Sequence, residues 1–199
     1  MGAPIDLSGF EDVFTASPDP WNTRTSRDEA LKREAILRAL GAGRRGRVLE
    51  LASGNGSNSA PLLARSLRLV ATDGAEAAVG LTRAALHEAS RSSRSVTAVA
   101  TLPDALPTGP FDAVVIAEVL YYLSDRDVRR LGRELAGRLR SGGRLVLAHH
   151  HVDFDDTASL PKICHASLLG GLAGAGRNAL RRQTFGRTGA WRVERVDIA

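Results

Sequence analysis

A glycine-rich turn follows the first buried-type apolar run of the chain, and an acid ends the second. The first run covers residues 47–51 and includes Glu50, and Asp73 ends the next run. The turn between them consists of Ala52, Ser53, Gly54, Asn55 and Gly56. Glycines let the backbone approach a ligand closely, and an acid after the second run can accept hydrogen bonds from ribose hydroxyls. The pattern predicts a nucleotide-type site on a βαβ unit.

The turn departs from the pattern that binds dinucleotides. A dinucleotide fingerprint has a glycine three residues after Gly56, where this chain has Ser59. Glu50 stands directly before the turn, and a carboxylate buried at a strand end needs a partner. A nucleoside ligand that carries an amine beside its ribose fits these residues better than a pyrophosphate does. An NAD-dependent oxidoreductase stays open as a rival, although Ser59 and the absence of a Tyr-x-x-x-Lys pair count against it.

Helical and strand patterns alternate along the chain, which is typical of a parallel sheet with helices on both faces. Expected helices cover residues 28–40, 57–67, 75–90, 125–139 and 159–172, and expected strands cover 47–51, 67–72, 95–100, 111–117, 144–149 and 191–198. The fold class is therefore α/β, with a doubly wound, mostly parallel sheet. We expect a single domain over residues 1–199, with a cap and helix in 1–43, a ligand-binding core in 44–150 and a substrate-side part in 151–199.

Composition excludes several classes of protein. The 199 residues are 43% hydrophobic, which suffices for one core, and no apolar run approaches the roughly 18 residues of a membrane span. The net charge of +5 comes almost wholly from arginine, because Lys32 and Lys162 are the only lysines. Such arginine usage is typical of a GC-rich bacterial genome, and its scatter along the chain argues against nucleic-acid binding. The lone Cys164 and the absence of a signal-peptide pattern favour a cytoplasmic protein.

These motifs resemble class I S-adenosylmethionine-dependent methyltransferases over nearly the whole chain. The resemblance rests on the turn after Glu50, on Asp73, and on a fourth strand that begins Phe111-Asp112. Three further stretches, residues 19–21 (Asp-Pro-Trp), 117–123 (Ala-Glu-Val-Leu-Tyr-Tyr-Leu) and 141–146, are similar to the nodulation protein S branch. That branch methylates an amine on a chitooligosaccharide.

The resemblance implies a Rossmann-like methyltransferase fold and a cofactor, S-adenosyl-L-methionine, with S-adenosyl-L-homocysteine as product. The residues it implies for the cofactor are Trp21, Glu50, Ala52, Ser53, Gly54, Asn55, Gly56, Asp73, Gly74, Thr101, Leu102, Ala117 and Glu118. Ala52 replaces the first glycine of the family's turn, and Thr101-Leu102 stand where many relatives have an acid for the adenine amine. An apolar adenine pocket near Leu102 follows. Relatives end with a seventh, antiparallel strand, and this chain stops after its sixth expected strand, so a sheet short of that strand is left open.

Candidate catalytic residues follow the expected fourth and fifth strands. Glu118 and His149 end these strands, where a doubly wound sheet binds its ligands. Either can accept a proton from an acceptor, and Tyr122 offers an aromatic face to a sulfonium. Trp21 is interpreted as a lid. Simple packing or capping stays open as an alternative for each of these side chains.

The three consecutive histidines 149–151 do not predict a metal site. Neighbouring side chains in an extended segment point to opposite faces, so these three cannot reach one ion together. Cys164-His165 lack the usual spacing of zinc ligands, and we expect no metal.

The sequence thus predicts a methyltransferase that acts on a small-molecule or saccharide-type acceptor, with an amine favoured over a hydroxyl. We expect a monomer or weak dimer. An O-methyltransferase of secondary metabolism and a catalytically silent S-adenosylmethionine-binding protein stay open as alternatives.

Overall fold

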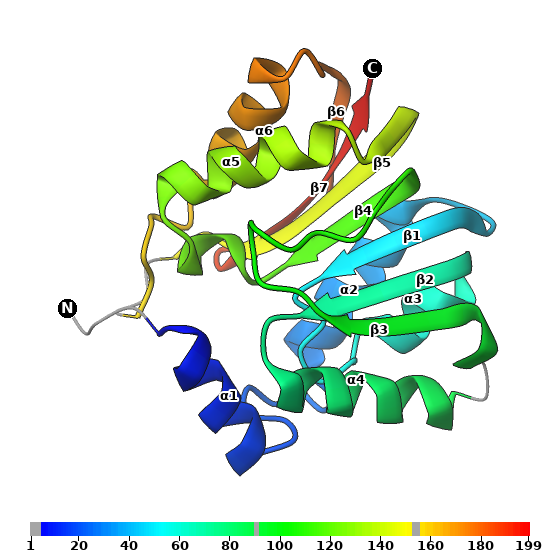
Figure 1. Ribbon diagram of the computed structural model, residues 1–199, viewed down its shortest axis with the longest axis vertical. Helices are drawn as coiled ribbons and strands as arrows, with labels where there is room; N and C mark the ends of the chain where they lie inside the picture. Colours follow the sequence, from blue (N-terminus) through cyan, green and yellow to red (C-terminus); the bar gives the residue numbers. More distant parts are fainter. Residues whose placement is uncertain (1–4, 90–91, 153–155) are drawn as a thin grey trace.

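A seven-stranded sheet forms the centre of the computed structural model, which describes residues 5–89, 92–152 and 156–199 (Figure 1). The strands are β1 (Arg45–Leu51), β2 (Ser66–Asp73), β3 (Ser95–Val99), β4 (Phe111–Ala117), β5 (Leu139–His150), β6 (Ala179–Arg187) and β7 (Trp191–Ile198). Their order is β3-β2-β1-β4-β5-β7-β6. The first five are parallel, whereas β7 runs antiparallel to both of its neighbours. The predicted doubly wound, mostly parallel sheet is confirmed.

Helices cover both faces of the sheet (Figure 1). They are α1 (Leu7–Ala16), α2 (Arg27–Leu40), α3 (Ser59–Ala64), α4 (Glu76–Glu88), α5 (Asp125–Ala136) and α6 (Cys164–Gly174), with short 3-10 turns η1 (Ser92–Arg94) and η2 (Leu120–Tyr122). One apolar cluster joins α2, α3 and α4 to one face of the sheet, and another joins α5 and α6 to the opposite face. Strand β4 is buried on both faces, as its continuous run of apolar residues predicts.

The last strand, whose absence the sequence left open, is present. Strand β6 lies in residues that the sequence assigns to a loop, and the expected sixth strand is β7, the antiparallel one. The pattern was hidden because β6 is the edge strand of the sheet. Most of its side chains are exposed on both faces, so arginines replace the apolar alternation that marks a half-buried strand.

Helix α1 is the other element that the sequence analysis missed. Asp6 caps it, since its carboxylate accepts a hydrogen bond from the Gly9 backbone N–H at 2.9 Å. Leu7, Phe10 and Phe14 recur on one side of the helix, and Phe14 packs against the first turn of α4. This helix has a direct bearing on the site because it supplies part of its aromatic wall.

Other expected elements differ only at their ends. Helix α3 is shorter than residues 57–67, α6 begins five residues later than expected, and β5 begins at Leu139 rather than at residue 144. Ser90, the last residue of the expected helix 75–90, lies outside the described residues. Among the helices of the described ranges, none has the length and apolar character needed to cross a membrane.

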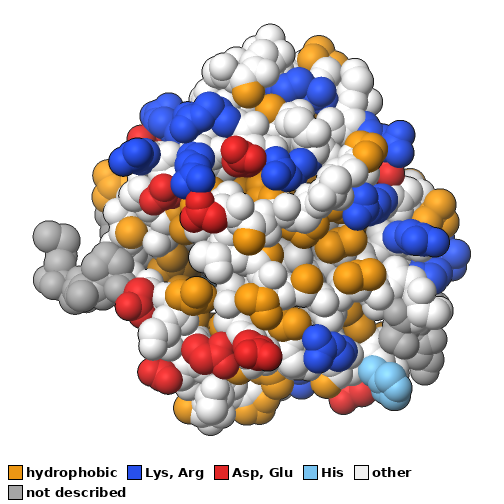
Figure 2. Space-filling model, in the orientation of Figure 1, with side chains coloured by type: hydrophobic (Ala, Val, Ile, Leu, Met, Phe, Trp, Pro, Cys, Tyr) orange, Lys and Arg blue, Asp and Glu red, His pale blue; other side chains and the backbone are white. Residues whose placement is uncertain are grey.

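The surface is uneven in charge. On the face shown in Figure 2, most Lys and Arg side chains lie over the upper part of the molecule and along its right edge. Acidic side chains form one group beside them at the upper left and another at the lower left.

Candidate functional site

A cavity of about 630 Å³ opens at the carboxyl ends of the parallel strands. Residues that end or directly follow all five parallel strands line it, and the strand order reverses between β1 and β4 at this edge. Ligands of doubly wound sheets bind at such a reversal. Twelve predicted site residues line the cavity, namely Trp21, Ala52, Ser53, Gly54, Asn55, Asp73, Gly74, Thr101, Leu102, Ala117, Glu118 and Tyr122. Three do not, namely Glu50, Gly56 and His149.

The turn after β1 is held by Asp73 at the end of β2. One carboxylate oxygen of Asp73 accepts a hydrogen bond from the Gly54 N–H at 2.8 Å, and the other accepts from Ala75 at 3.0 Å. Burial raises the pKa of Asp73, and these backbone donors offset part of that effect. Ala52 has a φ of 54°, a left-handed conformation in which an alanine methyl is tolerated at some cost. Glycine adopts this conformation without that cost.

The Asp19-Pro20-Trp21 segment is tied to the same turn. The Asn55 side-chain amide donates to Asp19 Oδ1 at 2.8 Å and to the Pro18 carbonyl at 3.2 Å. Trp21 is 46% exposed at the cavity and packs edge-on against Phe14, with ring centroids 5.4 Å apart. This arrangement is compatible with the predicted lid.

Aromatic rings form one wall of the cavity. Phe10 of α1 lies 4.9 Å from Tyr122, edge to face, and 6.3 Å from Trp21. Phe10 and Phe14 both line the cavity, although the sequence analysis did not select them. Burial, with the charges of Asp156 and Glu118, raises the pKa of Tyr122 to about 12, so its hydroxyl stays protonated.

Glu118 is held at the cavity by several hydrogen bonds from described residues. One carboxylate oxygen accepts from Lys32 Nζ at 2.5 Å, and the other accepts from the Tyr121 hydroxyl at 2.5 Å and from the His150 backbone N–H at 3.1 Å. His150 Nδ1 lies 3.0 Å from that second oxygen. Partial burial acts to raise the pKa of Glu118, but the hydrogen bond from His150 and the charge of Lys32 outweigh it and hold the pKa well below its usual range. Glu118 is therefore an anion, and with a φ of 53° it begins a sharp turn out of β4.

Lys32 is a site residue that the sequence analysis missed. It is 2% exposed, and its ammonium also bonds Glu29 at 2.7 Å. The signal was present in the sequence, because Lys32 stands in phase with Ala35, Ile36 and Ala39 on the buried side of α2. A lysine within the apolar stripe of a helix indicates a buried anionic partner.

His150, rather than His149, is the imidazole at the cavity. The odd-numbered residues Leu145 and Leu147 of β5 pack toward α5 and α6, and His149 follows them to that face. His150 lies on the face that α2 covers, beside Glu118. Both faces of β5 are apolar, so alternation alone could not show which histidine turns toward the ligand. The assignment of His149 to the cavity is wrong.

Glu50 and Gly56 support the turn from outside the cavity. Glu50 is buried and accepts a hydrogen bond from the Ser59 hydroxyl at 2.6 Å. Burial raises the pKa of Glu50 to about 8 despite that bond. Gly56 has a φ of 78°, and a Cβ atom there would lie 2.9 Å from Thr82 Cα of α4. Gly56 thus allows close packing of the turn on α4 and does not contact the cavity.

The cavity carries a marked negative balance. The described residues that line it include five carboxylates, those of Asp6, Glu29, Asp73, Glu118 and Asp156, against the single ammonium of Lys32. A cavity with apolar walls and an excess of one sign attracts ligands of the opposite sign. Its aromatic wall also suits a cationic group.

Comparisons with known proteins agree with this geometry. Residues 49–145 match the family described as a methyltransferase domain. No curated protein sequence matches the chain. Among solved structures, N-methyltransferase NodS from Bradyrhizobium japonicum WM9, crystallised with S-adenosyl-L-homocysteine, is 22% identical, with a TM-score of 0.76 over 96% of this chain and 97% of that one.

Two other similar structures have different acceptors in their names. Mitomycin 7-O-methyltransferase MmcR is 19% identical, with a TM-score of 0.68 over 94% of this chain and 60% of that one. Magnesium protoporphyrin IX methyltransferase from Synechocystis PCC 6803, solved with bound S-adenosylmethionine, is 18% identical, with a TM-score of 0.71 over 99% of this chain and 100% of that one. At these identities the likeness concerns the fold, which is the one predicted.

Proposed function

We propose that this chain, which has the fold of class I S-adenosylmethionine-dependent methyltransferases, transfers a methyl group from S-adenosylmethionine to an amine of a small-molecule or saccharide-type acceptor. The observation that carries the proposal is the balance of five carboxylates against one ammonium around the cavity. S-adenosylmethionine carries a sulfonium, and an amine acceptor arrives as an ammonium, so both ligands suit this charge.

The cavity fits the cofactor chemically. Asp73 would hold the ribose hydroxyls, because its carboxylate lines the cavity and has lone pairs beyond those used by Gly54 and Ala75. Leu102 would contact the adenine, and Trp21 with Tyr122 would face the sulfonium, where an aromatic ring contributes about 0.5–2 kcal/mol. When bound, the cofactor supplies an activated methyl group.

The remaining chemistry needed is removal of a proton, since an ammonium has no lone pair for the new carbon–nitrogen bond. Glu118 would hold and orient the acceptor ammonium, because it is an anion at the cavity. An ionised carboxylate can only accept hydrogen bonds, so His150 Nδ1 donates to it. His150 is the group to which we assign removal of the proton, with Glu118 orienting its ring as a carboxylate does in a catalytic triad. This pair takes the role that the sequence analysis gave to Glu118 and His149.

Methyl transfer to oxygen is the second candidate. It is favoured by the likeness to an O-methyltransferase and needs only that His150 accept a hydroxyl proton. The negative cavity gives no advantage to a neutral hydroxyl, and we therefore place the amine first.

Turnover of matched acceptors tests the choice. The protein would be incubated with S-adenosylmethionine and chitooligosaccharides that carry either a free or an N-acetylated amine, small amines, and phenols, and each product would be measured by mass spectrometry. We expect methyl addition to free amines and none to their N-acetylated partners. Methylation of phenols alone would instead assign O-methyl transfer, and formation of S-adenosylhomocysteine with none of these acceptors would contradict both candidates.

A further inference from the structure

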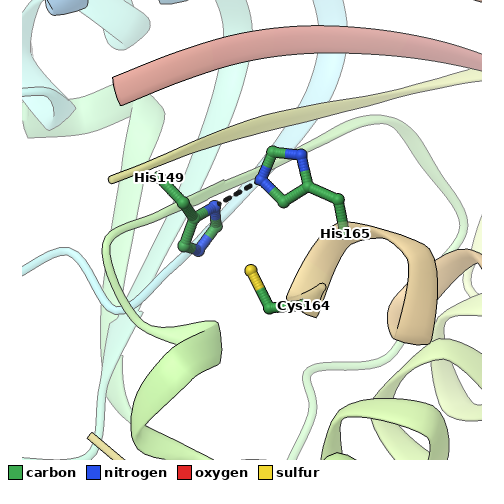
Figure 3. A group of neighbouring side chains, drawn as sticks. All are labelled: His149, Cys164 and His165. Carbon is green, nitrogen blue, oxygen red and sulfur yellow. Dashed lines mark hydrogen bonds between the residues drawn. The ribbon is translucent and has the colours of Figure 1, made fainter. Parts of the chain in front are cut away.

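His149, Cys164 and His165 form a buried cluster away from the cavity (Figure 3). His149 comes from the end of β5, and the other two begin α6 (Figure 3). None of the three lines the cavity, and the proposed proton transfer does not use them. Two buried imidazoles require a physical explanation, because each must satisfy two ring nitrogens without water.

The hydrogen bonds of the cluster run in one direction. The Leu120 backbone N–H donates to His149 Nε2 at 3.3 Å, so that nitrogen carries no proton. His149 Nδ1 must then donate to His165 Nε2, which lies 3.0 Å away. His165 Nδ1 in turn donates to the carboxylate of Glu194 in β7 at 2.7 Å. Every ring nitrogen is thus satisfied with both imidazoles neutral.

The pKa shifts of the cluster agree with neutral rings for His149 and His165 and with an ionised Glu194. Burial lowers the pKa of both histidines, and for His149 the neighbouring His165 lowers it further. Glu194 remains ionised, because the hydrogen bond from His165 and the charges of Arg192 and Arg182 outweigh its burial and lower its pKa to about 2.

A metal ion would explain the cluster less well. The ligand atoms of the three residues lie within 4.8 Å of one another. However, two nitrogens that bind one tetrahedral zinc at 2.0–2.1 Å are about 3.3 Å apart, whereas these two are 3.0 Å apart. The Cys164 thiol donates to the Pro161 carbonyl, and burial raises its pKa to about 12, which opposes the thiolate that a metal needs.

The His149 end of this row of hydrogen bonds holds Leu120, which belongs to the segment that carries the proposed reaction centre. Leu120 is wholly buried and begins η2, two residues after Glu118. Tyr121 and Tyr122 follow it in η2, and both line the cavity. A shift of Leu120 would therefore move Glu118, Tyr121 and Tyr122 together.

We propose that His165 is a positioning residue: with Glu194 it fixes the tautomer of His149, which in turn holds Leu120 and so sets the acceptor side of the cavity. The effect on catalysis rests on the proposed function, whereas the order of protons along the chain does not. An expected consequence is that loss of His165 weakens the handling of the acceptor and leaves the cofactor side, at β1 and β2, unchanged.

Nitrogen NMR of the histidine rings in the wild-type protein tests the order of protons along these hydrogen bonds without any acceptor. We expect His149 to carry its proton on Nδ1 and none on Nε2, which is the less common tautomer of a neutral imidazole in water. A proton on Nε2 of His149, or stoichiometric zinc in the purified protein that shifts these signals when a chelator removes it, would overturn the proposal.

Kinetics of His165 variants test the consequence. His165→Leu should lower kcat/KM for the acceptor about tenfold to hundredfold, as misplacement of reacting groups does, while the Kd of S-adenosylhomocysteine changes less than about threefold. His165→Gln should restore most of the activity, because its amide can both accept from His149 and donate to Glu194. His87→Leu, at an exposed position of α4, serves as the control.

Unchanged acceptor kinetics in His165→Leu would overturn the positioning role. The same conclusion would follow if His165→Gln were as impaired as His165→Leu. If the wild-type protein methylates no acceptor, the proposed function fails while the NMR result still decides the proton order.

Discussion

Lys32 Nζ of α2 lies 2.5 Å from Glu118 Oε1, at the end of β4. The lysine side chain is 3% exposed, and the glutamate side chain is 27% exposed and faces the cavity. A buried cation at the wall of the cavity therefore holds a partly exposed anion in place. This pair links the N-terminal helical region to the carboxyl edge of the sheet and keeps Glu118 charged.

Replacing Lys32 tests this link. Lys32→Met should lower the free energy of unfolding at pH 7 by about 1–3 kcal/mol, less than for a fully buried pair, because Glu118 is partly exposed and keeps its bonds to Tyr121 and His150. Chemical denaturation would measure the loss. The lowered pKa of Glu118 makes its stabilising contribution present above the usual carboxyl pKa and lost as pH falls toward the folded value, so the two proteins should converge in acid.

The exposed pair of Arg129 and Asp125 provides the control for Lys32. Its side chains are 49% and 46% exposed, and Arg129→Met should cost less than about 1 kcal/mol. A Lys32→Met loss no larger than that of Arg129→Met would show that the buried pair does not stabilise the site.

Glu50 should make the free energy of unfolding of the ligand-free protein decrease as the pH rises. Its folded pKa of about 8 lies above the ordinary value of 4.5, so the folded chain holds a proton that the unfolded chain releases across this window. Stability from this group is full below pH 4.5 and is lost toward pH 8, at up to about 1.4 kcal/mol per pH unit. Glu50→Gln should remove this slope in denaturation curves measured between these values. Glu88→Gln, at an exposed position of α4, should retain it, and parallel curves for wild type and Glu50→Gln would contradict the raised pKa.

Asp73 should contribute to cofactor binding directly. Asp73→Ala should weaken S-adenosylhomocysteine binding by about 1–3 kcal/mol, since it removes a charged acceptor for two hydroxyls. Asp73→Asn keeps one carbonyl oxygen and should lose less. Titration calorimetry would compare both with Asp104→Ala, whose exposed side chain lies outside the cavity. Equal affinity in Asp73→Ala and wild type would exclude Asp73 from the ribose site.

The predicted site residues that the structure brings together at the turn lie within short segments. The turn at Gly54 and the acid Asp73 are joined by one βαβ unit, whose spacing is fixed by a strand, a helix and a second strand. Local chain geometry therefore determines that they meet. Burial of β4 on both faces was readable for the same reason, because its apolar run is continuous.

The parts that the sequence did not predict depend on contacts between distant segments. Lys32 meets Glu118 across 86 positions of the chain, and only the packing of α2 on the sheet brings them together. The choice between His149 and His150 depends on which face of β5 turns toward α2, and both faces are apolar. Strand β6 is stabilised by pairing with β7 rather than by its own apolar pattern, so its residues resembled a loop.

Replacing the carboxylate of Glu118 by an amide tests the central claim most directly, namely that methyl transfer takes place at the Glu118–His150 side of the cavity. In one experiment, turnover of a methyl-accepting amine and the Kd of S-adenosylhomocysteine would be measured for wild type, Glu118→Gln and the exposed-position control Glu88→Gln. We expect Glu118→Gln to lower kcat by about 10²–10⁴-fold, as loss of a residue that supports proton transfer does, with the Kd changed less than about threefold. Near-normal kcat in Glu118→Gln would contradict the claim, and a large loss of S-adenosylhomocysteine affinity would assign Glu118 to the cofactor instead.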